Sequence, residues 1–200
     1  MLKHFLFVIT VSLFLLASPK LHAQQAEAPK YKDGDWWRVK VEFTHKGGFS
    51  RSGLCSENYP EYVVKIDQGK AKIFGLSGAN QEEIDCPLIE SQLLDSGSMR
   101  RGLLQFPLSV GKGWNYRYQT TGRRGQLVWN ESSAKVTAWE KVKLPQAEFE
   151  AFKIESYLIS ASQVIHIVHY APRVKAIILW NQDTTSVNRT VTLVNFNVSP

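Results

Sequence analysis

The residues with the greatest capacity for chemistry in this 200-residue chain are two histidines in the stretch VIHIVHY. On a helix, His166 and His169 would share one face and could bind a metal ion together. The β-branched residues around them favour a strand, which sends the two side chains to opposite faces. His45 is the only other histidine beyond residue 23, and no HExxH motif occurs. The sequence therefore predicts no metal site.

A Gly-Lys-Gly sequence in the stretch FPLSVGKGWNYRY raises the question of phosphate binding. A Walker loop has the form Gly-x-x-x-x-Gly-Lys-Ser/Thr, in which backbone amides surround the phosphate and the hydroxyl meets magnesium. Here Phe106 occupies the first glycine position and Gly113 the hydroxyl position, so both requirements fail. The stretch instead predicts a tight turn at Gly111 and Gly113 that leads into a strand.

Aromatic residues occupy alternate positions of that strand, so their side chains share one face. They are Trp114, Tyr116 and Tyr118. The rings either pack the core, where each buries about 150–250 Å², or line a concave pocket where their polar edges orient a lipid or sugar. Alternation fits both interpretations. We take these three residues, with Trp36 and Trp37, as candidate ligand-binding residues.

The sequence contains no recognisable catalytic set. The Gly-x-Ser-x-Gly motif of a nucleophile elbow does not occur. Glu140, Glu148, Glu150 and Glu155 alternate with apolar neighbours, which is typical of a solvated strand face. A carboxylate pair for glycoside hydrolysis stays open, because it is set by spacing in three dimensions. We expect no catalytic residue, no cofactor and a protein that is not an enzyme.

The first 23 residues have the pattern of a secretory signal. A basic residue, Lys3, precedes an apolar run over 5–17 that is too short to span a bilayer, and a small residue, Ala23, precedes a polar stretch. Cleavage near Ala23 predicts a periplasmic or secreted protein without a transmembrane segment. The formal net charge of +6 falls to +4 once Lys3 and Lys20 are removed, and this is too weak a basic balance for a nucleic-acid binder.

Two cysteines, Cys55 and Cys86, are the only ones in the chain. An exported chain meets oxidising conditions, so we expect them to form a disulfide. A bridge that encloses about 30 residues would contribute about 3–4 kcal/mol by the chain-entropy estimate. Free thiols or metal ligation are the alternative, although neither cysteine has a CxxC partner or a nearby histidine.

Period-two alternation recurs along most of the chain and predicts half-buried strands. Residues 37–43 alternate apolar with charged side chains, and 62–66 and 71–74 flank a turn at 67–70 in which Gly69 supplies a positive φ. Only 82–99 favours a short helix. Strands separated by short turns are antiparallel. The other strand-like stretches are 114–118, 126–142, 148–160, 163–170, 174–181 and 189–198.

These patterns predict a mainly β fold and a simple domain organisation. We expect a signal peptide at 1–23, a flexible leader at 24–33 and a single β-domain at 34–200. The domain is expected to be one antiparallel curved sheet, half-barrel or barrel-like, with at most one short helix. A β-sandwich is the alternative, because alternation does not fix register or closure.

Three stretches resemble a group of uncharacterised exported bacterial proteins. They are FPLSVGKGWNYRY, LPQAEFEAFKIES and HYAPRVKAIIL, where the group has F-P-L-x-V-G-K-x-W-x-Y-x-Y, V-P-A-G-x-F-x-A-F-K-I and Y-A-P-x-V-G. The resemblance covers about the C-terminal half. It implies a periplasmic antiparallel β-protein, similar to lipoprotein-carrier-like half-barrels, with no established chemistry. The chain departs at Glu148 and Lys175, which stand where the group has glycine.

Two functions remain after these exclusions. The first is non-enzymatic binding of a hydrophobic or amphipathic ligand, such as a lipid, or of another envelope component such as a protein. The second is a carbohydrate-interacting module, or a hydrolase, that uses exposed Trp36 and Trp37 as stacking platforms.

Overall fold

The computed structural model describes residues 24–46, 58–97, 101–121, 127–159, 163–184 and 187–200. Most of them belong to two consecutive meanders of strands. The first meander contains β2 (Trp36–His45), β3 (Glu61–Asp67), β4 (Lys70–Ser77) and β5 (Asn80–Ile84). The second contains β7 (Gly113–Thr121), β8 (Leu127–Lys143), β9 (Glu148–Leu158), β10 (Gln163–Ala171), β11 (Ala176–Asp183) and β12 (Val187–Asn197).

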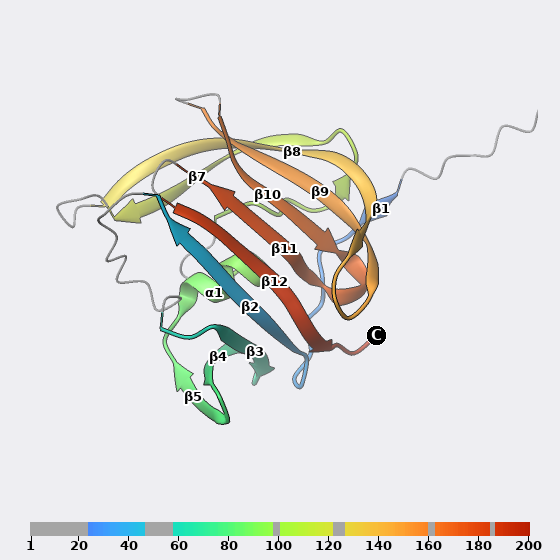
Figure 1. The fold of residues 1–200 in the computed structure, drawn as a ribbon. Coiled ribbons are helices and arrows are strands. Elements are labelled where there is room, and N and C mark those ends of the chain that lie inside the picture. The colour runs from blue at the N-terminus through green and yellow to red at the C-terminus, as the bar shows by residue number, and fades with distance from the viewer. Residues whose placement is uncertain (1–23, 47–57, 98–100, 122–126, 160–162, 185–186) are drawn as a thin grey trace, which may run out of the picture.

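The two meanders join where β12 pairs with β2, which gives one antiparallel sheet. Within the described residues the sheet has ten strands in the order β5-β4-β3-β2-β12-β11-β10-β9-β8-β7. It curves like a half-barrel and is not closed into a barrel, since β5 and β7 are its two edges (Figure 1). The expected fold class, mainly β with a curved antiparallel sheet and one short helix, is confirmed.

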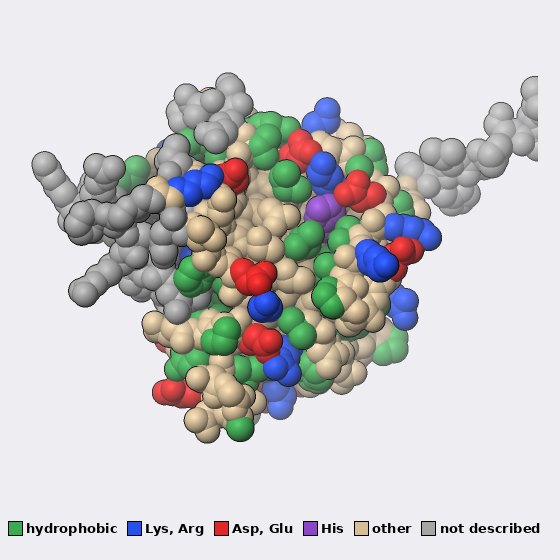
Figure 2. All heavy atoms as spheres, in the orientation of Figure 1, with side chains coloured by type: hydrophobic (Ala, Val, Ile, Leu, Met, Phe, Trp, Pro, Cys, Tyr) green, Lys and Arg blue, Asp and Glu red, His purple; other side chains and the backbone are tan. Residues whose placement is uncertain are grey.

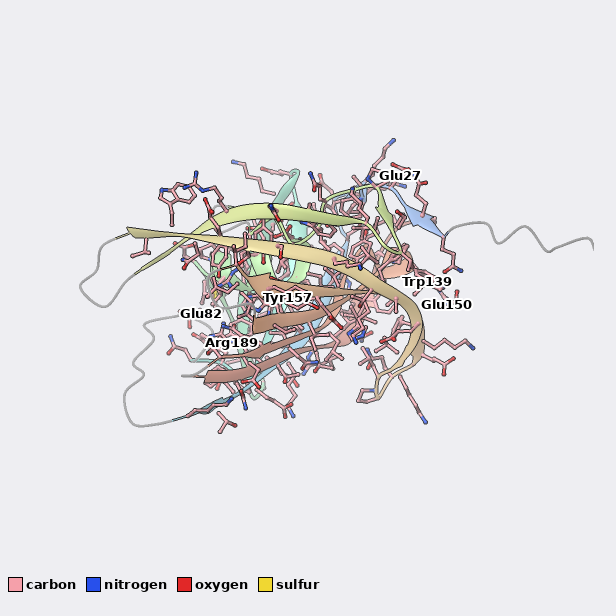
Figure 3. All side chains as sticks on the ribbon, turned by 90° about the horizontal axis from the view of Figure 1, so that it is seen from above. Glu27, Glu82, Trp139, Glu150, Tyr157 and Arg189 are labelled. Atoms are coloured by element: carbon pink, nitrogen blue, oxygen red, sulfur yellow. The ribbon has the colours of Figure 1, made fainter. Side chains whose placement is uncertain are left out.

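Local shifts in strand register accompany the curvature. β8 is 17 residues long and changes register against β9 between Val136 and Ala138. β10 shifts against β9 between Val164 and His166. Such bulges bend a strand and increase its twist. Figure 3 shows β8 arching over the other strands of the second meander, with Arg189 and Tyr157 toward one end of the strands and Trp139 toward the other.

The helix α1 (Pro87–Leu94) covers the concave face of the sheet. Its proline lies in the first turn, where the missing N–H has no helical partner. α1 contacts β11, β4 and β3 through a largely apolar set of side chains, and it ends at Asp95 in the left-handed conformation, with φ 49°. Its buried residues are Leu88, Ile89, Ser91, Gln92, Leu93 and Leu94.

Residues 24–33, expected as a flexible leader, contact the domain at several points. The short strand β1 (Gln25–Ala26) pairs with β6 (Leu108–Ser109). Farther on, the ring of Tyr31 meets Trp37 edge to face at 5.7 Å between centroids. These contacts tie the segment to the body of the protein.

The Gly-Lys-Gly sequence forms a turn into β7, as its pattern predicts. Gly111 has φ 91°, which favours glycine, and its N–H donates to the carbonyl oxygen of Val136 at 2.9 Å. The ammonium of Lys112 donates to the backbone carbonyl oxygens of Gln105, at 2.6 Å, and Pro107, at 2.8 Å. The lysine therefore stabilises its own turn.

Glu148 and Lys175, which stand where the similar proteins have glycine, adopt different backbone conformations. Glu148 begins β9 and has no positive φ, so this turn avoids the left-handed region. Lys175 follows the 3-10 turn η2 (Pro172–Val174) and does adopt φ 59°. Its ammonium donates to the carbonyl oxygen of Lys30 at 2.9 Å and lies 3.4 Å from Asp35 Oδ2. These bonds offset the strain of the left-handed backbone.

The strain at Lys175 predicts an order of stability for two variants that both remove the ammonium. The free energy of unfolding of Lys175→Gly should be about 1 kcal/mol higher than that of Lys175→Ala, because only alanine places a Cβ in the left-handed region. Urea denaturation followed by circular dichroism measures the difference. A Lys175→Ala variant as stable as Lys175→Gly would show that this backbone is not strained.

The outer face of the sheet carries charges of both signs. Figure 2 shows acidic and basic side chains interspersed over β2 and its neighbours. On β2, Arg38 pairs with Glu61 and Lys40 pairs with Glu42. Exposed pairs of this kind contribute about 0–1 kcal/mol each. These pairs make this face of β2 a solvated surface of mixed charge.

The predicted disulfide involves a residue beyond the described part of the chain. Cys86 is fully buried and directly precedes α1. Cys55 lies outside the described residues. The pairing of the two cysteines stays a prediction.

Candidate binding site

The aromatic residues of β7 share one face, as their alternation predicts, and pack into the molecule. Tyr116 and Tyr118 are each 9% exposed and stack with their ring centroids 5.8 Å apart. Trp114 is half-buried, and its Nε1–H donates to the carbonyl oxygen of Gly102 at 2.9 Å. None of the three lines the pocket at the ends of β10, β11 and β12. Their main contribution is to the core.

The two tryptophans of β2 point to opposite sides of the sheet. Trp37 is fully buried, and its Nε1–H donates to the carbonyl oxygen of Val174 at 2.8 Å. Trp36 is half-buried. A pair of exposed stacking platforms is therefore not formed. Five strands, β12 to β8, also lie between β2 and β7 in the sheet order, so the two aromatic groups are on strands that are not neighbours.

A row of polar side chains crosses the sheet instead. Ser156 on β9 is opposite His166 on β10, His166 is opposite Gln182 on β11, and Gln182 is opposite Arg189 on β12. Directly opposed residues of antiparallel strands project from the same face. We call Ser156, His166, Gln182 and Arg189 the polar row. The four residues come from four different strands, so only the register of these strands places them side by side.

A fifth polar residue, Arg101, meets this row from the segment after α1. The carboxylate of Asp95 accepts the backbone N–H of Arg101 at 3.0 Å, of Gly102 at 3.0 Å and of Leu104 at 2.8 Å. These bonds fix the start of the segment. The guanidinium Nη1 then lies 3.3 Å from His166 Nε2.

Aromatic rings complete the surroundings of Arg101. Its guanidinium carbon is 5.2 Å from the ring centroid of Tyr118 and 5.9 Å from that of Trp180. The rings of His166 and Trp180 are 4.9 Å apart. Burial lowers the pKa of the guanidinium, but arginine titrates so far above neutral pH that the side chain stays charged.

His166 is neutral at pH 7. Burial lowers its pKa well below the ordinary value, and the charges of Arg101 and Arg189 lower it further. A neutral imidazole has one N–H and one acceptor nitrogen. Because the Arg101 guanidinium only donates, Nε2 must accept and Nδ1 must carry the proton. His166 is 2% exposed, and this Nδ1–H has no hydrogen-bond partner in the described residues.

Other buried polar groups near the concave face also lack partners among the described residues. They are Trp180 Nε1, Gln182 Oε1 and both side-chain amide atoms of Gln92 on α1. Each buried group without a hydrogen bond costs about 1–3 kcal/mol. Most buried polar groups in proteins are satisfied, so several exceptions close together mark a candidate site. His169 Nδ1, on the opposite face of β10, is a further exception among the described residues.

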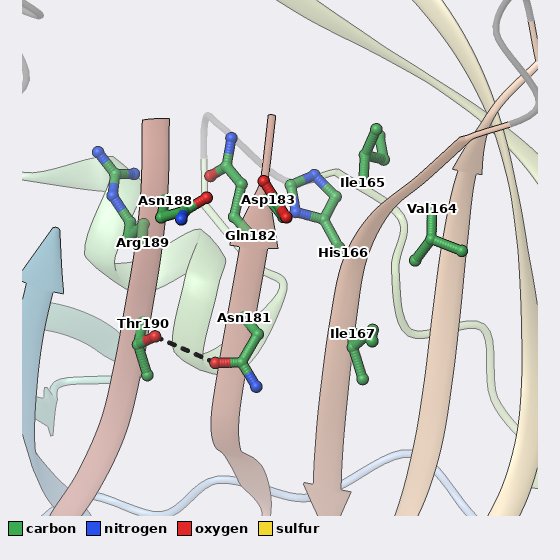
Figure 4. Close-up of a pocket in the computed structure, with 10 residues that line it drawn as sticks. All are labelled: Val164, Ile165, His166, Ile167, Asn181, Gln182, Asp183, Asn188, Arg189 and Thr190. Carbon is green, nitrogen blue, oxygen red and sulfur yellow. Dashed lines mark hydrogen bonds between the residues drawn. The ribbon is translucent and has the colours of Figure 1, made fainter. Parts of the chain in front are cut away.

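The polar row borders a pocket at the ends of β10, β11 and β12. The pocket has a volume of about 370 Å³. Figure 4 shows His166, Gln182 and Arg189 at the strand ends with Ile165 beside them, and α1 behind the strands. Its lining residues are Val164, Ile165, His166, Ile167, Asn181, Gln182, Asp183, Asn188, Arg189 and Thr190.

His169 lies on the face opposite to His166, as the strand pattern predicts. It is 7% exposed, and its Nε2 is 2.9 Å from Glu140 Oε1. Within the described residues, no group of three or more His, Cys, Asp or Glu side chains converges as metal ligands would. The described residues also contain no helix that is both long and apolar enough to cross a membrane.

Comparisons with known proteins identify no family for this chain. No protein-family model matches it, and no curated protein is similar to it. Among solved structures, it is similar to the crystal structure of the hypothetical lipoprotein YmcC from Escherichia coli K12, with a TM-score of 0.43 and 8% sequence identity. The alignment covers 82% of this chain and 85% of that one. A likeness at this level carries no functional argument.

Proposed function

We propose that this is an exported, non-enzymatic protein that binds a hydrophobic or amphipathic ligand at the pocket beside the polar row. The observation that carries the proposal is that two residues of the pocket lining, His166 and Gln182, have buried polar atoms without partners among the described residues, Nδ1 and Oε1. A bound molecule that hydrogen-bonds to these groups would offset the cost of burying them.

The composition of the pocket supports an amphipathic ligand. Val164, Ile165 and Ile167 provide apolar surface, whereas His166, Gln182 and Arg189 provide polar groups. Ligand sites commonly combine apolar walls with a few polar groups that fix orientation, and they span about 300–1,000 Å³. The volume of about 370 Å³ suits a small ligand or one end of a longer one.

Export is supported by the pattern of residues 1–23. The proposed compartment is the periplasm or the exterior of the cell. A partner that is an envelope protein has less support than a small ligand. The polar groups without partners lie beside a pocket, and a small ligand fits a pocket better than a protein surface does.

The carbohydrate alternative has less support from the described residues. It relies on Trp36 and Trp37 as exposed platforms, but Trp37 is fully buried. The hydrolase variant needs two carboxylates that face one cleft. Asp183 is the only carboxylate that lines the pocket among its described residues, and it pairs with Lys46.

Filling the pocket should abolish binding. Ile167 is half-buried in the pocket wall, so Ile167→Trp places an indole where the ligand would lie. N-phenyl-1-naphthylamine, an uncharged fluorophore that brightens in apolar surroundings, is the probe. We expect Ile167→Trp to weaken its binding at least about tenfold, which corresponds to 1.4 kcal/mol.

Val194→Trp is the matched control, since Val194 is also half-buried and lines a different pocket. It should bind the probe as the wild type does. A wild-type protein that does not bind the probe, or an Ile167→Trp variant that binds it unchanged, would contradict the proposed site.

A further inference from the structure

We infer that the polar end of the ligand is an uncharged group that both donates and accepts a hydrogen bond, such as a hydroxyl or an amide, held between His166 and Gln182. This inference rests on the proposed function and specifies the chemistry of that site. It depends on three features of the two residues. Both line the pocket, they are neighbours across β10 and β11, and they present one donor and one acceptor that have no partner among the described residues.

His166 and Gln182 lie side by side in the wall of the pocket. They are directly opposite each other where β10 pairs with β11, and such residues project from the same face with Cβ atoms about 4.5–5.5 Å apart. Figure 4 shows both side chains at the ends of their strands. A small polar group at this end of the pocket is therefore able to contact both side chains.

His166 supplies the donor. The guanidinium Nη1 of Arg101 lies 3.3 Å from Nε2 and only donates, so Nε2 accepts and the proton of the neutral imidazole is on Nδ1. Arg101 is not part of the pocket lining, and its role is to fix this tautomer. The Nδ1–H is buried and has no partner in the part of the chain that the structure describes. The ligand atom that meets it is an acceptor.

Gln182 supplies the acceptor. Its side chain is half-buried, and its Oε1 has no hydrogen-bond partner among the described residues. The two groups do not bond to each other, so one group between them would satisfy both if it accepts from His166 Nδ1–H and donates to Gln182 Oε1. A hydroxyl or an amide does both. A carboxylate has no proton to donate, and an ammonium has no lone pair with which to accept.

The charged side chains of the lining favour an uncharged group. Arg189 and Asp183 are the charged residues among the described lining, and their formal charges sum to zero. Lys46, which pairs with Asp183, is exposed to solvent. Behind the lining, the charges of Arg101 and Asp95 oppose each other. An ionised ligand would lose its hydration in the pocket without a net opposite charge in the lining to offset that cost.

The test uses displacement of N-phenyl-1-naphthylamine by compounds that share one chain length and differ in the polar end. They are 1-decanol, its methyl ether 1-methoxydecane, and decanoate. The ether keeps the oxygen acceptor and lacks only the donor proton, whereas decanoate carries a negative charge. With the wild type, 1-decanol should displace the probe at a concentration about tenfold lower than either of the other two compounds.

The variant Gln182→Met removes the acceptor and keeps a side chain of similar length. It should abolish the preference for 1-decanol over 1-methoxydecane and leave displacement by the ether unchanged. Gln81→Met makes the same chemical change on the exposed strand β5 and should retain the preference. If Gln182→Met does not fold, the comparison of 1-decanol with its ether in the wild type decides the question by itself.

Each contrary outcome has a distinct meaning. Equal displacement by 1-decanol and 1-methoxydecane would overturn the inference and leave the proposed function intact, because the apolar chain alone would account for binding. Displacement by decanoate at the lowest concentration would also overturn it, since the amide of Gln182 would then present its N–H groups to an anion. A Gln182→Met variant that retains the preference would show that Gln182 is not the acceptor. If the probe does not bind, or no compound displaces it, the proposed function fails together with this inference.

Discussion

Replacing Asp35 by asparagine should lower the free energy of unfolding by about 3 kcal/mol, because a buried charged group with several partners is lost. Asp35 is fully buried, and Ser199 N–H donates to its Oδ1 at 2.7 Å. Lys32 N–H donates to its Oδ2 at 3.0 Å, and the Lys175 ammonium lies 3.4 Å from the same oxygen. One carboxylate thus joins the start of the domain, its C-terminus and the turn after β10.

The same carboxylate predicts a pH dependence. Burial by itself would raise the pKa of Asp35, but the N–H groups of Ser199 and Lys32 and the charge of Lys175 outweigh it, so the pKa lies below its ordinary value. The stabilisation is therefore complete above the unfolded-state pKa of about 3.9 and is lost as pH falls through the folded-state pKa. The difference between wild type and Asp35→Asn should shrink below about pH 4.

Urea denaturation at several pH values measures this difference. Asp33→Asn is the control, because Asp33 Oδ1 also accepts a backbone N–H, from Gly69 at 2.8 Å, but the side chain is exposed. We expect the control to cost less than about 1 kcal/mol. An Asp35→Asn variant as stable as the control would refute the account of this carboxylate.

Replacing Gln92 by methionine should raise the free energy of unfolding by about 1–2 kcal/mol. Gln92 is fully buried on α1, and neither its Nε2 nor its Oε1 has a hydrogen-bond partner in the described residues. Methionine has a similar length and shape, favours helices and carries no group that needs a hydrogen bond. A single substitution in the core that stabilises a protein is unusual, which makes this prediction discriminating.

Thermal and urea unfolding measure the effect of Gln92→Met. Gln81→Met on the exposed strand β5 is the control and should change the stability by no more than about 0.5 kcal/mol. A destabilised Gln92→Met would mean that the amide has partners in solution. A stabilised one supports the view that this side of the sheet keeps polar groups at the expense of stability, as binding sites commonly do.

Most of the fold follows from local sequence patterns. Apolar and charged side chains alternate along residues 37–43, and the structure places β2 there. The turn at 67–70 has positive φ at Gln68 and Gly69, as a tight hairpin requires. Alternation does not encode which strands become neighbours. The pairing of β12 with β2, which joins the two meanders, therefore appears only in the structure.

The candidate site was harder to predict from the sequence. The alternation of Trp114, Tyr116 and Tyr118 gave the correct shared face, but it did not distinguish core from pocket. The polar row depends on register across several strands. The sequence contained one signal. His166 and Gln182 are polar residues at inward-facing positions of strands that are otherwise rich in apolar residues. A pattern that places polar groups inside a sheet indicates a site or a buried network.

The central claim is that the protein carries a ligand at the pocket beside the polar row. Native mass spectrometry of the exported protein, followed by organic extraction and analysis of the extract, tests it most directly. We predict a reproducible small-molecule adduct in the wild type and in Val194→Trp, and no adduct in a folded Ile167→Trp. A wild-type protein with the mass of the bare chain, or an adduct that persists unchanged in Ile167→Trp, would contradict the claim.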